Sequence, residues 1–136
     1  LFPYTTLFRS IGVKGPLNSA ADTDFARRHG VTMVTRDELE NSGPATIRAF
    51  VDGLGGAPAY VTFDVDVVDP AFAPGTGTPS VGGISSADAL TLVRSLRGLN
   101  VAGADVVEVL PDRDHAGITA LLAAHVAFEI VCLSCP

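Results

Sequence analysis

The chain has 136 residues, of which 47% are hydrophobic and 18% are charged, and its formal net charge is −6. This length suits one small domain, and the composition is that of a folded globular protein. The negative charge argues against a nucleic-acid partner, because it repels phosphate backbones. We find no secretory signal peptide and no apolar stretch long enough to cross a bilayer, so we expect a cytoplasmic protein that does not contact a membrane.

The first ten residues, LFPYTTLFRS, are richer in aromatic side chains than the rest of the chain. They resemble the in-frame translation of a common short-read sequencing adapter. We therefore interpret residues 1–10 as an assembly artefact and residues 11–136 as part of a longer domain. The alternative is a genuine strand or turn that carries Phe2, Tyr4 and Phe8.

Strand-like and helix-like segments alternate along the rest of the chain. Runs rich in β-branched residues predict strands at 11–13, 31–34, 59–64 and 101–109. Helical periodicity, capping residues and glycine stops predict helices at 21–30, 44–54, 85–97 and 114–133, with a short helical segment at 37–40. This alternation predicts an α/β fold with a parallel sheet.

Two carboxylates, Asp64 and Asp66, stand at the end of the third predicted strand. Residues i and i+2 of a strand point to the same side, and ligands of open α/β sheets bind at the carboxyl ends of strands. Adjacent carboxylates repel each other unless a proton or a cation compensates, and a hard cation such as Mn²⁺ prefers oxygen ligands. The pair could span two metal ions roughly 3.5–4 Å apart. A solvated pair at a strand end is the alternative.

The segment 62–83, TFDVDVVDPAFAPGTGTPSVGG, resembles the second metal-binding signature of the ureohydrolase (arginase/agmatinase) family. The resemblance extends to residues 11–16 and 103–109, and it covers the chain from Ile11 to its end. The loop PGTGTP at 74–79 is more similar to agmatinases than to arginases. The resemblance implies an arginase-like, three-layer αβα fold with a parallel sheet, of which this chain is the C-terminal half.

The resemblance also implies roles for four residues. Asp64 would bridge two Mn²⁺ ions, and Asp66 would bind one of them. Glu108 would hold the guanidinium group of the substrate, and Thr78 would line the substrate pocket. The implied reaction is hydrolysis of a guanidino compound to urea and an amine, with agmatine, which gives putrescine, as the first choice. Guanidinobutyrate, guanidinopropionate and arginine are alternatives, and a homo-oligomer, a trimer or hexamer, is the expected assembly.

The remaining metal ligands of the family, an early histidine and an Asp-Ala-His-x-Asp run, do not occur in this sequence. We therefore assign no catalytic residue to the chain and expect the polypeptide to be inactive alone. Two other classes stay open. One is a non-catalytic ureohydrolase-like subunit. The other is a different two-metal hydrolase, such as a phosphoesterase, although the loop 74–79 shows no phosphate-binding set of Arg, Lys or His.

Several other residues are given structural roles. We expect Asp69 and Pro70 to shape the loop, and Asp114 to favour the start of the last helix. His125 and Glu129, one helical turn apart, are interpreted as a helix-surface pair rather than as metal ligands. The Cys132-x-x-Cys135 pair lacks the second ligand pair or the βαβ setting that a zinc or redox site needs.

Overall fold

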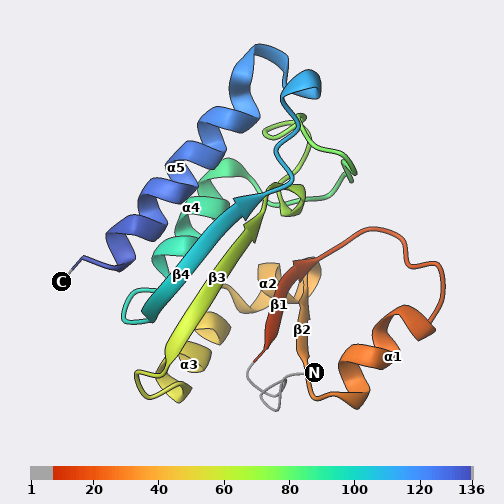
Figure 1. Cartoon of the computed structure of the whole chain (residues 1–136). Coiled ribbons are helices and arrows are strands. Elements are labelled where there is room, and N and C mark those ends of the chain that lie inside the picture. The colour runs from red at the N-terminus through yellow and green to blue at the C-terminus, as the bar shows by residue number, and fades with distance from the viewer. Residues whose placement is uncertain (1–7, 136) are drawn as a thin grey trace.

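The computed structural model describes residues 8–135, and its strands form two parallel pairs (Figure 1). Strand β1 (Arg9–Val13) pairs with β2 (Thr32–Thr35), and β3 (Pro58–Asp64) pairs with β4 (Asn100–Val107). The α/β class and the parallel pairing are therefore as predicted. The strands do not form one continuous sheet, because β2 leads at once into a helix and does not pair with β3.

Each predicted helix is present, with ends that differ by a few residues. The α-helices are α1 (Ala21–Arg28), α2 (Arg36–Ser42), α3 (Ala45–Gly53), α4 (Ser86–Arg94) and α5 (Ile118–Leu133). In the connections between the described elements lie the single 3-10 turns η2 (Val65–Val67), η3 (Pro111–Arg113) and η4 (His115–Gly117). Helices α4 and α5 pack together along one side of the β3–β4 pair (Figure 1).

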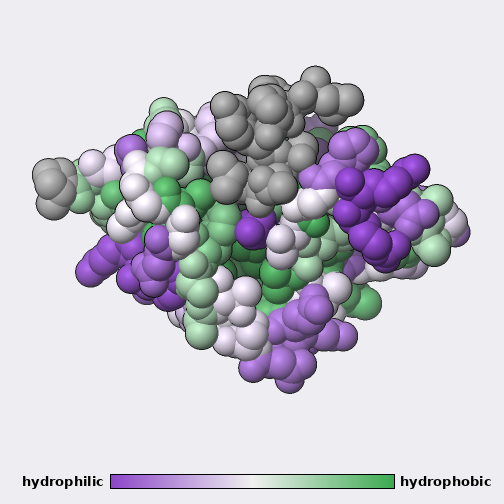
Figure 2. Space-filling model, turned by 90° about the horizontal axis from the view of Figure 1, so that it is seen from below, coloured by the Kyte–Doolittle hydropathy of each residue, from purple (hydrophilic) through white to green (hydrophobic). Residues whose placement is uncertain are grey.

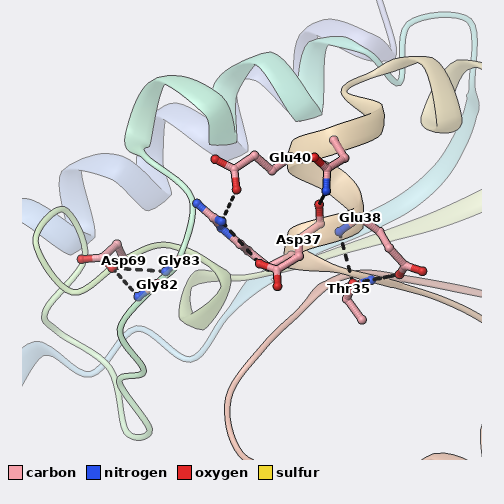
Figure 3. Close-up of polar contacts among 9 residues, drawn as sticks. Thr35, Asp37, Glu38, Glu40, Asp69, Gly82 and Gly83 are labelled. Carbon is pink, nitrogen blue, oxygen red and sulfur yellow. Dashed lines mark hydrogen bonds and ion pairs between the residues drawn. The ribbon is translucent and has the colours of Figure 1, made fainter.

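Two helices begin at reciprocal capping boxes. At α2, the Thr35 hydroxyl accepts a hydrogen bond from the Glu38 backbone N–H, and the Glu38 carboxylate accepts one from the Thr35 N–H (Figure 3). The same arrangement joins Ser85 and Asp88 at α4. Each box satisfies two backbone donors that a helix start otherwise leaves unpaired, so these helix starts follow from local sequence.

The segment 19–22 also resembles a capping box in sequence, but Ser19 and Asp22 do not form the reciprocal pair of hydrogen bonds seen at α2 and α4. The Asp22 carboxylate accepts hydrogen bonds from the backbone N–H groups of Asn18 and Ser19, at 2.8 and 3.2 Å. The Ser19 hydroxyl accepts from the N–H of Ala21 instead of completing the box. Helix α1 nevertheless begins at Ala21, as predicted, with Ala20 as its N-cap residue.

The core lies between the β3–β4 pair and the helices, and it includes the start of the long loop that follows β3. Val65 and Ala73 are fully buried, and Val68 is 1% exposed. Around them pack Ile47 of α3, Val93 of α4 and Val126 of α5, all buried. The loop is therefore anchored by apolar side chains on both sides of its polar residues. Hydrophobic residues also occupy the centre of the face seen from below, flanked by hydrophilic ones (Figure 2).

The two faces of β3 differ in exposure. Phe63 is buried and Val61 is half-buried, whereas Tyr60, Thr62 and Asp64 are exposed. The Tyr60 hydroxyl donates a hydrogen bond of 3.0 Å to Asp105 on β4, so both strands contribute to the exposed face. Within residues 8–135, helices cover one face of this pair, and the third layer of the predicted αβα arrangement does not cover the other.

Helix α5 carries apolar residues on both its buried and its exposed sides. The segment His115–Leu133 has a mean hydropathy of 2.0 and is long enough to cross a bilayer by length and composition, so the statement that no such stretch exists is wrong. One helix of this kind is weak evidence for a membrane span, since core helices of soluble proteins have the same length and composition. Leu122, Val126 and Ile130 are buried toward α4 and β4, whereas Leu121 and Phe128 are exposed.

Strand β1 begins inside the segment interpreted as an artefact. Arg9 and Ser10 pair with Thr32 and Met33 of β2, and the Arg9 guanidinium lies 4.6 Å from the centre of the Phe50 ring. Residues 1–7 lie outside the described part of the chain. The origin of residues 1–10 therefore stays a prediction.

Candidate metal centre

Asp64 and Asp66 lie together where β3 ends, but not as neighbours on one face of a strand. The strand stops at Asp64, and Asp66 is in the 3-10 turn η2. The Asp64 carboxylate accepts a hydrogen bond of 2.8 Å from the Asp66 backbone N–H, which bends the chain at this point. Asp66 is therefore not on a strand face, as the predicted alternation required, although it lies next to Asp64.

The Asp64 carboxyl sits in an unfavourable environment for its own negative charge. Although Asp64 is exposed as a whole residue, partial desolvation of its carboxyl is the largest cause that raises its pKa, and the neighbouring negative charge of Asp66 raises the pKa further. The hydrogen bond from the Asp66 N–H and the positive charge of Lys14 lower the pKa, but the net shift is upward. A bound cation would relieve both the burial of charge and the repulsion between the two anions.

Both oxygens of the Asp66 carboxylate accept hydrogen bonds from threonines of the signature loop. The Thr76 hydroxyl donates to Oδ1, and the Thr78 hydroxyl donates to Oδ2. Thr78, predicted to line a substrate pocket, therefore contacts a predicted metal ligand. Sequence reasoning passed over Thr76, although its place in the same Gly-Thr-Gly-Thr run was the available signal.

Asp69 shapes the loop, as predicted. Its carboxylate accepts hydrogen bonds from the backbone N–H groups of Gly82 and Gly83, at 2.8 and 3.1 Å (Figure 3). It accepts another, of 2.9 Å, from the N–H of Ala71. The bond from Ala71 is the main cause that lowers the pKa of Asp69, and those from Gly82 and Gly83 add to it against the opposing effect of burial. Asp69 thus ties both ends of the loop together.

Glu108 lies beside this site because β3 and β4 run parallel and in register. Asp64 pairs with Val107, so Glu108 follows directly at the neighbouring strand end. Its backbone has a φ of 67°, a left-handed conformation that costs energy for a residue other than glycine. A Cβ added to Gly77 would lie 3.6 Å from the Glu108 carboxylate, which places the signature loop next to that side chain.

Lys14 supplies the positive charge next to these carboxylates. Its ammonium donates a hydrogen bond to the backbone carbonyl of Ser80, at the far side of the signature loop. Burial lowers the pKa of Lys14, whereas the charges of Asp66, Asp69 and Asp64 oppose that shift. The sequence alone did not indicate a role for Lys14, and the fold shows that three aspartates, Asp64, Asp66 and Asp69, act on its charge.

The carboxylate pair fits part of a divalent metal site. Hard oxygen donors, clustered negative charge and partial burial suit Mn²⁺. Within residues 8–135, however, no group of three or more His, Cys, Asp or Glu side chains could hold a metal ion. Asp64 and Asp66 alone would therefore supply only two ligands, and a complete site would need others. A cavity of about 270 Å³ between α2, α3 and α4 lies elsewhere and is lined by none of the predicted site residues.

The other weighed residues have structural contacts. The Asp114 carboxylate accepts hydrogen bonds from the N–H groups of Thr119 and Ala120 at the start of α5, each at 2.8 Å. Glu129 forms an ion pair with Arg94 of α4, in agreement with its structural interpretation. Cys132 and Cys135 are free and exposed.

Comparisons with known proteins agree with this arrangement. The family model described as "Arginase family" matches residues 6–133. A guanidinopropionase of Pseudomonas aeruginosa is 50% identical over 124 residues, which are 90% of this chain and 39% of that protein. An agmatinase of Chromobacterium violaceum is 51% identical over 94 residues, which are 69% of this chain and 29% of that protein.

Solved structures show the same fold. The proclavaminate amidino hydrolase of Streptomyces clavuligerus has a TM-score of 0.83 and 43% identity, covering 93% of this chain and 41% of that one. An arginase of Bacillus caldovelox has a TM-score of 0.80 and 25% identity, covering 90% of this chain and 42% of that one. The chain thus spans about two fifths of the length of these relatives. The family match, the relatives and the shared fold together show that the chain belongs to the arginase family of ureohydrolases.

Proposed function

We propose that the longer protein containing this chain, here called the complete protein, hydrolyses a guanidino compound to urea and an amine. The observation that carries the proposal is the convergence of Asp64, Asp66 and Glu108 at the carboxyl ends of two neighbouring parallel strands. That place is where open α/β sheets bind their ligands. Membership of the arginase family supports the same chemistry, since the matched relatives include proteins named agmatinase and guanidinopropionase.

Each side chain has a distinct task in this proposal. Asp64 and Asp66 would hold Mn²⁺, and ligands from the rest of the complete protein would finish a binuclear centre. Divalent cations supply, when bound, Lewis acidity and a lowered pKa of water at the site. Glu108 would accept hydrogen bonds from the planar guanidinium, for which a carboxylate is a well-matched partner. Guanidinium is a poor electrophile, so hydrolysis requires that it be held in the right orientation toward an activated nucleophile, and Glu108 would hold it there.

Agmatine, which yields putrescine and urea, is the substrate we propose first, because the loop 74–79 is agmatinase-like. Guanidinopropionate and guanidinobutyrate are the closest competitors. Relatives named guanidinopropionase and guanidinobutyrase match 90% of this chain, at 50% and 38% identity. Arginine is a further alternative. We propose a cytoplasmic homo-oligomer, a trimer or hexamer, as the working form of the complete protein.

The test is urea release by the complete protein, loaded with Mn²⁺, from a panel of agmatine, arginine, guanidinobutyrate and guanidinopropionate. We expect agmatine to give the highest kcat/KM. We expect Glu108→Gln to lower kcat/KM for every substrate of the panel. A preference for a carboxylate-bearing substrate would reject agmatine but keep guanidino hydrolysis. Release of no urea from any substrate, with the fold intact, would instead favour a non-catalytic ureohydrolase-like subunit.

A further inference from the structure

Thr76 is the most buried polar residue in contact with the candidate metal centre. It is 1% exposed, whereas Thr78, two residues later, is exposed. Its hydroxyl donates to Oδ1 of Asp66, and this contact spans ten positions of the chain. A buried hydroxyl that loses its hydrogen bonds to water destabilises the fold unless it finds another partner. The bond to Asp66 is therefore maintained, and it holds the Asp66 carboxylate in one orientation.

The backbone that carries Thr76 is held by the start of α5. The Gly75 N–H donates a hydrogen bond of 2.8 Å to the hydroxyl of Thr119, which is completely buried. The Gly75 carbonyl accepts another, also of 2.8 Å, from the Leu110 N–H. Asp114 packs against Gly75 so closely that a Cβ there would lie 2.5 Å from the Asp114 Cβ.

These contacts form one continuous connection from α5 to Asp66. Thr119 fixes Gly75, Gly75 fixes the position of Thr76, and Thr76 fixes one oxygen of Asp66. Metal-binding carboxylates are commonly oriented by hydrogen bonds of this kind, and their loss weakens metal binding. Thr76 is too buried to reach a substrate in solvent, which separates its role from that of the exposed Thr78.

We propose that Thr76 is a positioning residue, whose buried hydroxyl holds the Asp66 carboxylate in the orientation that binds the metal ion. The inference rests on the proposed function, in that it takes Asp66 as a metal ligand. It adds a residue that acts through Asp66 and not by touching the metal or the substrate.

The experiment is a calorimetric titration of Mn²⁺ into the metal-free complete protein, compared with its Thr76→Val and Thr76→Ser variants. Valine keeps the shape of threonine and removes the hydroxyl, whereas serine keeps the hydroxyl. We expect Thr76→Val to weaken Mn²⁺ binding by about 10- to 100-fold, and Thr76→Ser to bind as the unmodified protein does. The matched control is Thr91→Val, which removes an exposed hydroxyl that bonds only within α4.

The electron paramagnetic resonance spectrum of bound Mn²⁺ is a second measurement. It would not change if Thr76 only stabilised the fold. We expect an altered spectrum for Thr76→Val and an unchanged one for Thr76→Ser. Equal Mn²⁺ affinity of Thr76→Val and the unmodified protein would overturn the inference. If Thr76→Val does not fold, a tenfold loss of affinity in the folded Thr76→Ser variant would overturn it as well.

The same titration separates this inference from the proposed function. If the unmodified complete protein binds no Mn²⁺, the metal-dependent function itself fails. If it binds Mn²⁺ and Thr76→Val binds it equally well, the function stands and only the role of Thr76 is lost.

Discussion

Gly83 lies where a side chain has no room. A Cβ at this position would be 2.3 Å from the backbone nitrogen of Asp69, and backbone cannot move aside as a flexible side chain can. The contact comes from the loop closing on itself, since the Asp69 carboxylate binds the N–H groups of Gly82 and Gly83. The glycine is thus required by a close approach within the loop.

We therefore expect Gly83→Ala to lower the free energy of unfolding by about 1–3 kcal/mol, the usual effect of overpacking a tight site. The measurement is urea unfolding of the complete protein. Gly53→Ala is the control, because that glycine lies in α3 and a Cβ there meets nothing within 4 Å. It should be neutral, or stabilising by up to about 1 kcal/mol. Equal effects of the two substitutions would contradict the steric argument.

The loop-shaping role of Asp69 was predictable because an aspartate followed by proline favours a turn. The contact of Thr76 with Asp66 was not predicted, although Thr76 stands in the same Gly-Thr-Gly-Thr run as Thr78, because the preceding residue, Gly75, is held by α5, more than forty positions away. Lys14 is a similar case, since its carbonyl partner, Ser80, is distant in the chain. At this scale, local contacts were predictable and long-range contacts were not.

At the scale of elements, helix α5 starts with a carboxylate that is not its own cap residue. Asp114 accepts hydrogen bonds from the N–H groups of Thr119 and Ala120, although the helix begins at Ile118. Burial raises the pKa of Asp114, but the bonds from Ala120 and Thr119 outweigh it, so the pKa is lowered. A negative charge at this end also suits the helix dipole.

A lowered pKa means that ionised Asp114 stabilises the folded state. The contribution is present above the pKa of the unfolded chain, about 3.9 for an aspartate, and disappears as the pH falls through the lower folded value. We expect Asp114→Asn to lower the Tm at pH 7 and the difference to shrink toward pH 3. The control is Asp112→Asn, two residues earlier. A Tm difference that does not change between pH 7 and pH 3 would rule out this charge effect.

Strand β3 ends before the second aspartate, so Asp64 and Asp66 lie together for a different physical reason than the predicted strand alternation. Alternation along a strand placed Asp64 and Asp66 on one face, but β3 ends at Asp64. A tight turn, closed by the Asp64 carboxylate, brings the second aspartate back. Asp64 and Asp66 remain neighbours because a tight turn, like a strand, keeps residues i and i+2 close together.

At the scale of the whole molecule, the candidate metal centre has too few ligands among the described residues to hold a metal ion. The described residues bring together Glu108 and the two carboxylates that are predicted to bind metal, and the chain spans about two fifths of the length of its relatives. We therefore expect the 136-residue polypeptide alone, with Mn²⁺ and agmatine, to release no urea above a protein-free blank. Circular dichroism is the control for folding, and urea release by the isolated chain would show that its own residues suffice.

The sequence by itself determined the α/β class, the order of the elements, the family and the position of the carboxylate-rich loop. These follow from periodicity, capping residues and a local signature, all of which act over a few residues. Only the tertiary structure decided which groups meet: Glu108 beside Asp64, Lys14 at Ser80, and Thr76 on Asp66. The physical reason is that strand register and loop closure join residues far apart in the chain, and no local pattern encodes those distances.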